Sequence, residues 1–323
     1  MNFKPVGSSG AVEGFCLVKS LEVKKTAKGL PYLDLTLTDS TGEINGKLWD
    51  YKEDIHGDIK VNNVVKIRGT ESMFNDMPQL RVDRIRPALA SDNVKIEDFV
   101  PSSEYSGESM FDIIYSTAEN FENKELKNLV TAILSENKEA LTVCPAAFKL
   151  HHAIRGGLMY HTLSVMRLAE KVSDIYPSVD RELLLSGVIL HDVAKIWEFD
   201  VSDAGVVTGY TVEGMLIGHL VKGTMNIEKK GRELGTDPNT LMLIEHMVLS
   251  HHGEPEFGAA VRPMFLEAEI LSQLDMLDAR IYEITSAAGE VGSGEFTARQ
   301  WALENRKLYN PGIKEIKPKA NLL

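Results

Sequence analysis

Cysteine is scarce in this chain, with two among 323 residues. Cys16 and Cys144 lie far apart in the sequence and make no metal-type pair. No run of about 18 apolar residues occurs, so no membrane-spanning helix is expected. The first residues, MNFKPVGSSGAVEGF, lack the basic and then apolar pattern of a signal peptide. These absences predict a reducing, cytoplasmic setting without a membrane partner.

Negative charge exceeds positive charge, but the excess is uneven. The chain has 35 basic and 47 acidic residues, a formal net charge of −12. Residues 1–90 hold 13 basic and 12 acidic residues, whereas residues 91–323 hold 22 and 35. The first part could therefore meet a polyanion without strong repulsion. The second part could do so only through local basic groups or bound cations.

Alternation of apolar and polar residues predicts strands between residues 12 and 86. In YLDLTLTD, Leu33, Leu35 and Leu37 face one side and the intervening polar residues face the other. About five such segments occur: GFCLVKSLEVKKT, YLDLTLTD, EINGKLWD, NVVKIRGTESMF and PQLRVDRIRP. This count predicts a small five-stranded barrel of the OB type, with a fragment of a β-sandwich as the alternative.

The apolar pattern becomes helical from about residue 109 onward. The preceding segment is rich in proline, serine and acidic residues, which is typical of a linker. The sequence therefore predicts a multidomain β plus all-α chain. Its predicted parts are a barrel domain at 1–90, a linker at 91–108, a helical domain at 109–310 and a C-terminal tail at 311–323.

Eight of the nine histidines lie in the helical half. Five of them form an ordered series with two aspartates, at gaps of 23 to 32 residues: His161, His191, Asp192, His219, His251, His252 and Asp275. Each gap is about one helix plus a connection, so separate helices can bring these residues to one point. A single histidine is more often a core or surface residue than a ligand. The complete ordered set nevertheless predicts a metal centre.

Imidazole and carboxylate ligands suit Mn, Fe, Co, Ni or Zn. Asp192 is central to the series, and its two oxygens could bridge two cations. Two cations about 3.5–4 Å apart can clamp a phosphoryl group and supply a hydroxide nucleophile. Lys195 lies three residues after Asp192, on the same side of a helical turn, and could contact a phosphate oxygen.

The last ligand is ambiguous. Asp275 and Asp278 share one helical stripe with Leu271, so either aspartate could face the metal. A structural charge pair between Asp278 and Arg280 is the alternative.

Residues 151–280 resemble the HD-domain metal-dependent phosphohydrolases. The resemblance rests on HHAIRGGLMYHTLSV, ILHDVAKI, IGHL, LSHHG and LSQLDMLDAR. It assigns one metal to His161, His191, Asp192 and Asp275. It makes His219, His251 and His252 similar to the second-metal set of binuclear members. The segment HHGEPEFG lacks the Gly-Tyr-Pro signature of cyclic dinucleotide phosphodiesterases, which disfavours a signalling nucleotide as substrate.

The resemblance extends to the first domain. The segment GFCLVKSLEVKKTAKGLPYLDLTLTDSTGEINGKLWD is similar to the OB-type domain of the YhaM family, and GLMYHTLSV, HHGEPEFG and DMLDAR follow in the family's order. FGAAVRP departs from the FGSP expected after the histidine pair. The resemblance implies a cytoplasmic 3′→5′ exoribonuclease that needs a divalent metal, with manganese favoured, and it hints at a homo-oligomer.

The enzyme hypothesis has single-stranded RNA, and single-stranded DNA as a further candidate, entering the helical domain by its 3′ end. Hydrolysis would release nucleoside 5′-monophosphates. Asp192 would bridge the cations and Lys195 would steady the phosphate charge, which makes them the predicted catalytic residues. One alternative is a protein that binds single strands or nucleotides without cleavage. Another is hydrolysis of a free nucleotide, for which an OB domain would be superfluous.

An OB barrel binds single strands through a basic groove and aromatic platforms. The predicted nucleic-acid contacts are Lys24, Lys25, Lys28, Tyr32, Lys47, Arg68, Phe74 and Arg81. Trp49 and Phe15 are instead predicted to be core residues. A solvated face is the usual role of lysines on a small barrel, and it is the alternative for this set.

Overall fold

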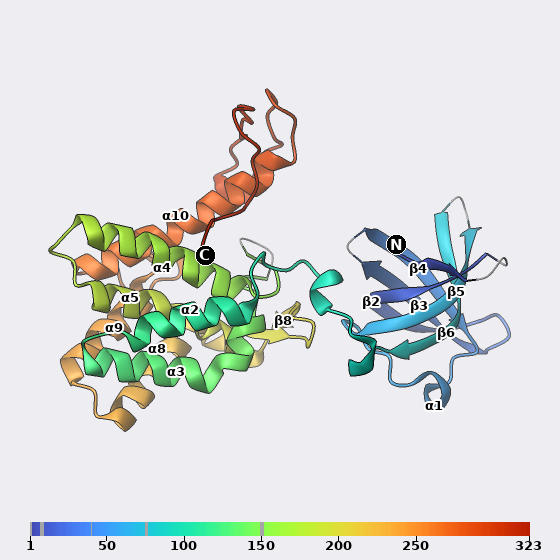
Figure 1. Ribbon diagram of the computed structural model, residues 1–323, viewed down its shortest axis with the longest axis horizontal. Coiled ribbons are helices and arrows are strands. Elements are labelled where there is room, and N and C mark those ends of the chain that lie inside the picture. The colour runs from blue at the N-terminus through green and yellow to red at the C-terminus, as the bar shows by residue number, and fades with distance from the viewer. Residues whose placement is uncertain (1, 7–9, 40, 75–76, 149–151) are drawn as a thin grey trace. The chain divides into compact units, whose positions relative to one another are not determined.

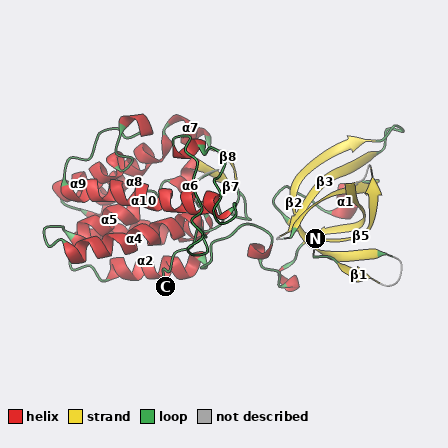
Figure 2. Ribbon diagram, turned by 90° about the horizontal axis from the view of Figure 1, so that it is seen from above, coloured by secondary structure: helices red, strands yellow, loops and turns green. Residues whose placement is uncertain are grey.

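The computed structural model describes residues 2–6, 10–39, 41–74, 77–148 and 152–323. The chain forms two compact units, one of strands and one of helices (Figures 1 and 2). The first comprises Met1–Ser102 with Ser202–Val206, and the second comprises Ser103–Val201 with Val207–Leu323.

The strands of the first unit close into a barrel. They are β2 (Ala11–Lys25), β3 (Pro31–Asp39), β4 (Gly42–Trp49), β5 (Val64–Phe74) and β6 (Met77–Pro87). Their order is β2-β3-β4-β6-β5, and β5 pairs back onto β2. The β4–β6 pair is parallel and the other pairs are antiparallel. This closed order confirms the predicted OB-type barrel.

Alternation of side chains fills the barrel. Leu33, Leu35 and Leu37 of β3 are fully buried and pack with Ile67 of β5 and Leu80 of β6. A short strand, β1 (Lys4–Val6), pairs with β2, and a one-turn helix, α1 (Glu53–His56), lies between β4 and β5. The outward residues of the same strands are therefore left for solvent or a ligand.

Several helices of the second unit begin at side-chain caps. Ser106, Asn123, Asp180 and Asp237 each accept hydrogen bonds from backbone N–H groups of the following turn. The helices are α2 (Gly107–Glu119), α3 (Lys124–Val143), α4 (Gly157–Ile175), α5 (Arg181–Leu190), α6 (Lys195–Glu198), α7 (Val212–Leu216), α8 (Gly218–Leu234), α9 (Pro238–Ser250) and α10 (Leu266–Gly289).

Shorter elements complete the two units. A hairpin of β7 (Phe199–Val201) and β8 (Val207–Tyr210) follows α6. The 3₁₀ turns are η1 (Ala90–Asp92), η2 (Ile96–Asp98), η3 (Pro255–Phe257) and η4 (Trp301–Leu303).

The centre of the helical unit is formed by α4 and α5. From Leu183 to Leu190 every residue of α5 is buried, as is α4 from its start to Met166. The end of the chain also packs here, since Leu322 is buried in the same core and the backbone N–H of Ala320 donates to the Tyr160 hydroxyl at 2.7 Å. Within the described residues, no helix is both long and apolar enough to cross a bilayer.

A carboxyl pair between α8 and α9 makes the stability of this unit depend on pH. Burial and a hydrogen bond with Glu228 raise the pKa of Glu245 to about 7. The protonated pair therefore stabilises the fold fully below the ordinary carboxyl pKa near 4.5, and this contribution is lost as the pH rises through about 7.

Replacing Glu245 by Gln should raise the melting temperature at pH 8.5 by roughly 2–4 °C, because the variant has no second carboxylate to desolvate. At pH 5 the variant should show no gain. Thermal melts at both pH values test this, with Glu233→Gln on the exposed side of α8 as the control. An equal change at the two pH values would contradict the assignment.

Candidate metal centre

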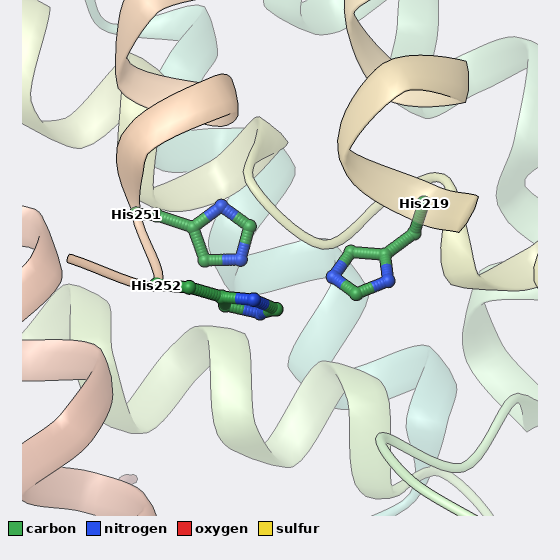
Figure 3. Close-up of side chains that lie close together, drawn as sticks. All are labelled: His219, His251 and His252. Atoms are coloured by element: carbon green, nitrogen blue, oxygen red, sulfur yellow. The ribbon is translucent and has the colours of Figure 1, made fainter. Parts of the chain in front are cut away.

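The helical unit brings all seven predicted metal-binding residues into one cluster. His161 comes from α4, His219 from the first turn of α8, and Asp275 from α10. The remaining four follow directly after helices: His191 and Asp192 after α5, and His251 and His252 after α9. Figure 3 shows His219, His251 and His252 turned toward one another from α8 and the end of α9. Helix ends supply most of the cluster because the chain can present side chains inward where a helix stops.

Asp192 lies at the centre of the cluster and divides it. Its Oδ2 atom is 3.4 Å from His191 Nε2 and 3.8 Å from His161 Nε2. Its Oδ1 atom is 3.5 Å from His219 Nε2 and 3.7 Å from His251 Nε2. Each carboxylate oxygen therefore faces a different pair of imidazoles.

The two aspartates of α10 lie on opposite sides of one imidazole. Asp275 Oδ1 is 3.0 Å from His161 Nε2 and 3.9 Å from His191 Nε2, on the side of Asp192. Asp278 Oδ2 contacts His161 Nδ1 at 2.8 Å, behind the ring. The geometry thus favours Asp275 as the ligand. The alternative pairing of Asp278 with Arg280 is wrong, because the Arg280 guanidinium instead contacts Glu304 at 2.8 Å.

All five imidazoles are oriented by a contact at Nδ1. Each Nδ1 atom lies 2.7–2.9 Å from an oxygen of a carboxylate or of a backbone carbonyl. Such an oxygen accepts a hydrogen bond and does not donate one. Nδ1 is therefore the donor, and Nε2 points into the cluster. The accepting groups are the carboxylates of Asp278 for His161 and Glu198 for His219, and the backbone carbonyls of Val188 for His191, Val248 for His251 and Phe257 for His252.

Several hydrogen-bond acceptor atoms of the cluster lie close together, as they would around a cation. Among the described residues, Asp192 Oδ1, His219 Nε2 and His251 Nε2 are buried without a hydrogen-bond partner. The Nε2 atoms of His161 and His191 face each other at 3.3 Å. Burying acceptors without donors is costly, and a divalent cation would satisfy these atoms together. The residues present therefore fit a divalent-metal centre.

Burial lowers the pKa of His161, but Asp275 and Asp278 raise it to about 10, so this ring must lose a proton when a metal binds. The charge states of Asp192, His251 and His252 suit a cation directly. Burial opposes ionisation of Asp192, but Lys195, whose Nζ lies 2.6 Å from Oδ2, and nearby imidazoles hold the pKa of this carboxyl well below its usual range. Burial keeps the pKa of His251 well below its usual value and also lowers that of His252. A carboxylate and neutral imidazoles are the forms that bind metals.

Three residues around the centre were not predicted: Glu198, Ser164 and His152. Glu198 lies three residues after Lys195 but carries no recognisable motif. His152 belongs to the segment HHAIRGG, so its position beside the first ligand helix was the available signal. Its Nε2 atom is 2.9 Å from Asp278 Oδ2.

The barrel unit presents an aromatic pair beside lysines. The rings of Tyr32 on β3 and Trp49 on β4 are 4.6 Å apart, and the Lys47 ammonium lies 5.3 Å from the Tyr32 ring centre. Trp49 is 44% exposed, so the prediction that it is a core residue was wrong. Leu48 takes the inward position, and strand alternation turns Trp49 outward. Phe15 is half-buried.

The predicted basic contacts are partly neutralised. The Asp34 carboxylate contacts Lys24 at 2.7 Å and Lys47 at 3.2 Å. Burial opposes this ionisation, yet these lysines and Asn45 lower the Asp34 pKa to about 2. Asp34 therefore offsets part of the positive charge that Lys24 and Lys47 bring to this face.

The other predicted contacts fall into two groups. Lys25 and Lys28 are exposed near the β2–β3 turn, Phe74 is exposed at the end of β5, and Arg81 of β6 is the register partner of Lys47. Arg68 is the exception, because its register partner on β6 is Arg84. The structure therefore does not bring Arg68 to the Tyr32–Trp49 face.

Added Mn²⁺ should raise the melting temperature of the helical unit, because a ligand that binds only the folded state stabilises it. The expected gain is about 2.7 kcal/mol at a concentration 100 times the dissociation constant. Asp192→Ala should abolish most of this shift, whereas Asp112→Asn on exposed α2 should keep it. Equal shifts in wild type and Asp192→Ala, measured by thermal melts with and without the ion, would argue against this site.

Comparisons with known proteins agree with this geometry. A family model described as the HD domain matches residues 158–280. The 3′-5′ exoribonuclease YhaM of Bacillus pumilus is 38% identical over 299 residues, which cover 93% of this chain and 94% of that protein. The protein of the same name from Bacillus subtilis is 36% identical over 300 residues, covering 93% and 95%. That from Listeria monocytogenes is 38% identical over 301 residues, covering 93% and 95%. The chain therefore belongs to the YhaM family.

Proposed function

We propose that the protein is a metal-dependent 3′→5′ exoribonuclease that degrades single-stranded RNA. The observation that carries this proposal is the position of Asp192, whose two oxygens face separate pairs of imidazoles. This is the arrangement expected of a carboxylate shared by two cations. The names of the YhaM relatives support the reaction and its direction.

The ligands divide into two sets that share Asp192. His161, His191 and Asp275 complete one set, and His219, His251 and His252 complete the other. Mn²⁺ is the proposed ion, and Co, Fe, Ni and Zn suit the same donors. When bound, such cations polarise a phosphoryl oxygen and make water a stronger nucleophile at neutral pH.

A charged side chain of the protein can balance the negative charge of the phosphate. Lys195 is buried beside Asp192, which together with other nearby carboxylates raises the lysine pKa against the effect of burial. Its ammonium therefore stays charged and can offset the terminal phosphate. Asp192 and Lys195 are the proposed catalytic residues. An oxygen of water bonds to phosphorus, the P–O3′ bond breaks, and the leaving 3′ oxygen takes a proton, which yields a nucleoside 5′-monophosphate.

The barrel is the proposed nucleic-acid-binding domain. Tyr32 and Trp49 offer rings on which bases can stack, and base–aromatic stacking tolerates any sequence. Lys25 and Lys28 supply charge for the phosphates, and Arg81, whose Nε lies 3.4 Å from the Asp83 carboxylate, adds to it. Lys24 and Lys47 can contribute only in exchange for Asp34.

Wild type and Asp192→Ala should differ sharply on 5′-labelled single-stranded RNA with Mn²⁺. Wild type should give a ladder that shortens from the 3′ end, and the variant should be slower by at least about 100-fold, because it removes a ligand shared by both ions. Products resolved by size over time check this, with Asp112→Asn as the control.

Other outcomes of that experiment are equally informative. If neither protein cuts the strand but both retain it, the protein binds single strands without cleavage. A DNA strand of the same sequence shows whether the sugar matters.

Trp49→Ala should weaken binding of single-stranded RNA by roughly 5–150-fold, since stacking of one base is worth about 1–3 kcal/mol. Hydrolysis of bis(p-nitrophenyl) phosphate, a phosphodiester without bases, should be unchanged. Trp301→Ala, which removes an exposed tryptophan of the helical unit, is the matched control. Unchanged RNA binding by Trp49→Ala would exclude this face as the platform.

A further inference from the structure

The imidazole of His161 lies between two carboxylates of one helix and contacts both. Asp275 Oδ1 lies 3.0 Å from its Nε2 atom, and Asp278 Oδ2 lies 2.8 Å from its Nδ1 atom. The two aspartates are three residues apart on α10, so both lie on the same face of the helix. The ring cannot turn without losing one contact.

Asp278 is itself fixed by two further side chains. The Ser164 hydroxyl of α4 donates to Oδ1, and His152 Nε2 lies 2.9 Å from Oδ2. His152 is 1% exposed, and its backbone has a φ of 53°, a left-handed conformation that costs energy for a residue with a side chain. Its ring packs 4.1 Å from that of Tyr282. Such a costly conformation persists where the surroundings enforce it, here beside a metal ligand.

Glu198 plays the matching part in the other half of the cluster. Its Oε2 atom lies 2.9 Å from His219 Nδ1. The Glu198 backbone is enclosed by α7, since the Thr211 N–H donates to its carbonyl at 2.9 Å. A Cβ atom added at Gly214 would lie 2.3 Å from the same oxygen, so glycine allows this close approach.

These two histidines differ from the other three. Backbone carbonyls hold His191, His251 and His252, so the fold alone sets the orientation of those rings. His161 and His219 are instead held by carboxylates, which also make the imidazole a stronger metal ligand. One carboxylate serves each side of Asp192.

We infer that Asp278 and Glu198 are positioning residues, each of which sets the affinity of one half of the centre for its cation. Asp278, braced by His152 and Ser164, acts on the ion of the His161 set, and Glu198 acts on the ion of the His219 set. The inference rests on the proposed two-cation centre.

Mn²⁺ titration followed by electron paramagnetic resonance tests this with Asp278→Asn and Glu198→Gln, which preserve side-chain size and remove the charge. Each variant should bind one ion 10–100-fold or so more weakly and keep the other at wild-type affinity. The kcat for RNA should fall while the KM stays unchanged. Asp112→Asn and Glu213→Gln, which remove exposed carboxylates of α2 and α7, should bind both ions normally.

A third substitution shows which of the two ions each variant weakens. In a His252→Ala background, the second ion is already weakened, so Glu198→Gln should add little whereas Asp278→Asn should weaken the remaining ion. If Asp278→Asn fails to fold by circular dichroism, Ser164→Ala removes only one brace and should produce a smaller loss at the same ion.

Two results would overturn the inference: wild-type affinity for both ions in Asp278→Asn and Glu198→Gln, or equal weakening of both ions in each variant. Failure of wild type to bind two ions is a different result. It would reject the proposed centre itself, and the inference with it.

Discussion

The structure of the helical unit depends on burying one carboxylate among imidazoles. Asp192 is 2% exposed, and its two oxygens face four imidazole Nε2 atoms and the ammonium of Lys195. Acceptors packed against acceptors repel each other, so this arrangement is stable only with cations or protons among them. The surrounding helices place these groups around one point where cations can bind. The catalytic proposal follows from this arrangement.

The orientation of the ligands explains why helix ends meet at this point. His191 and His251 each direct Nδ1 to a carbonyl three residues earlier, in the last turn of α5 and α9. Those carbonyls have no partner within the helix, so the imidazole satisfies the helix end and is fixed by it. The segment around LHDVAK therefore ends a helix and also carries two of the proposed metal ligands.

The sequence alone predicts the features that follow from local patterns of residues. The alternation around Leu33 places the strands, and the ordered His and Asp series identifies the set that converges. The prediction that Trp49 is a core residue was wrong, and the inward position of Leu48 already implies that its neighbour points out. The choice between Asp275 and Asp278 could not be made, because both lie on one helical stripe and differ only in which nitrogen of His161 they meet. The roles of Glu198 and His152 depend on contacts between separate segments, which no spacing reveals.

The central claim is that Asp192 is shared by two cations. Anomalous diffraction from crystals grown with Mn²⁺ tests it most directly, because each manganese ion gives its own peak. The account predicts two peaks flanking the Asp192 carboxylate, one beside Oδ2 toward His161 and His191, the other beside Oδ1 toward His219 and His251. A single peak, or peaks that leave Asp192 outside the coordination sphere, would contradict it.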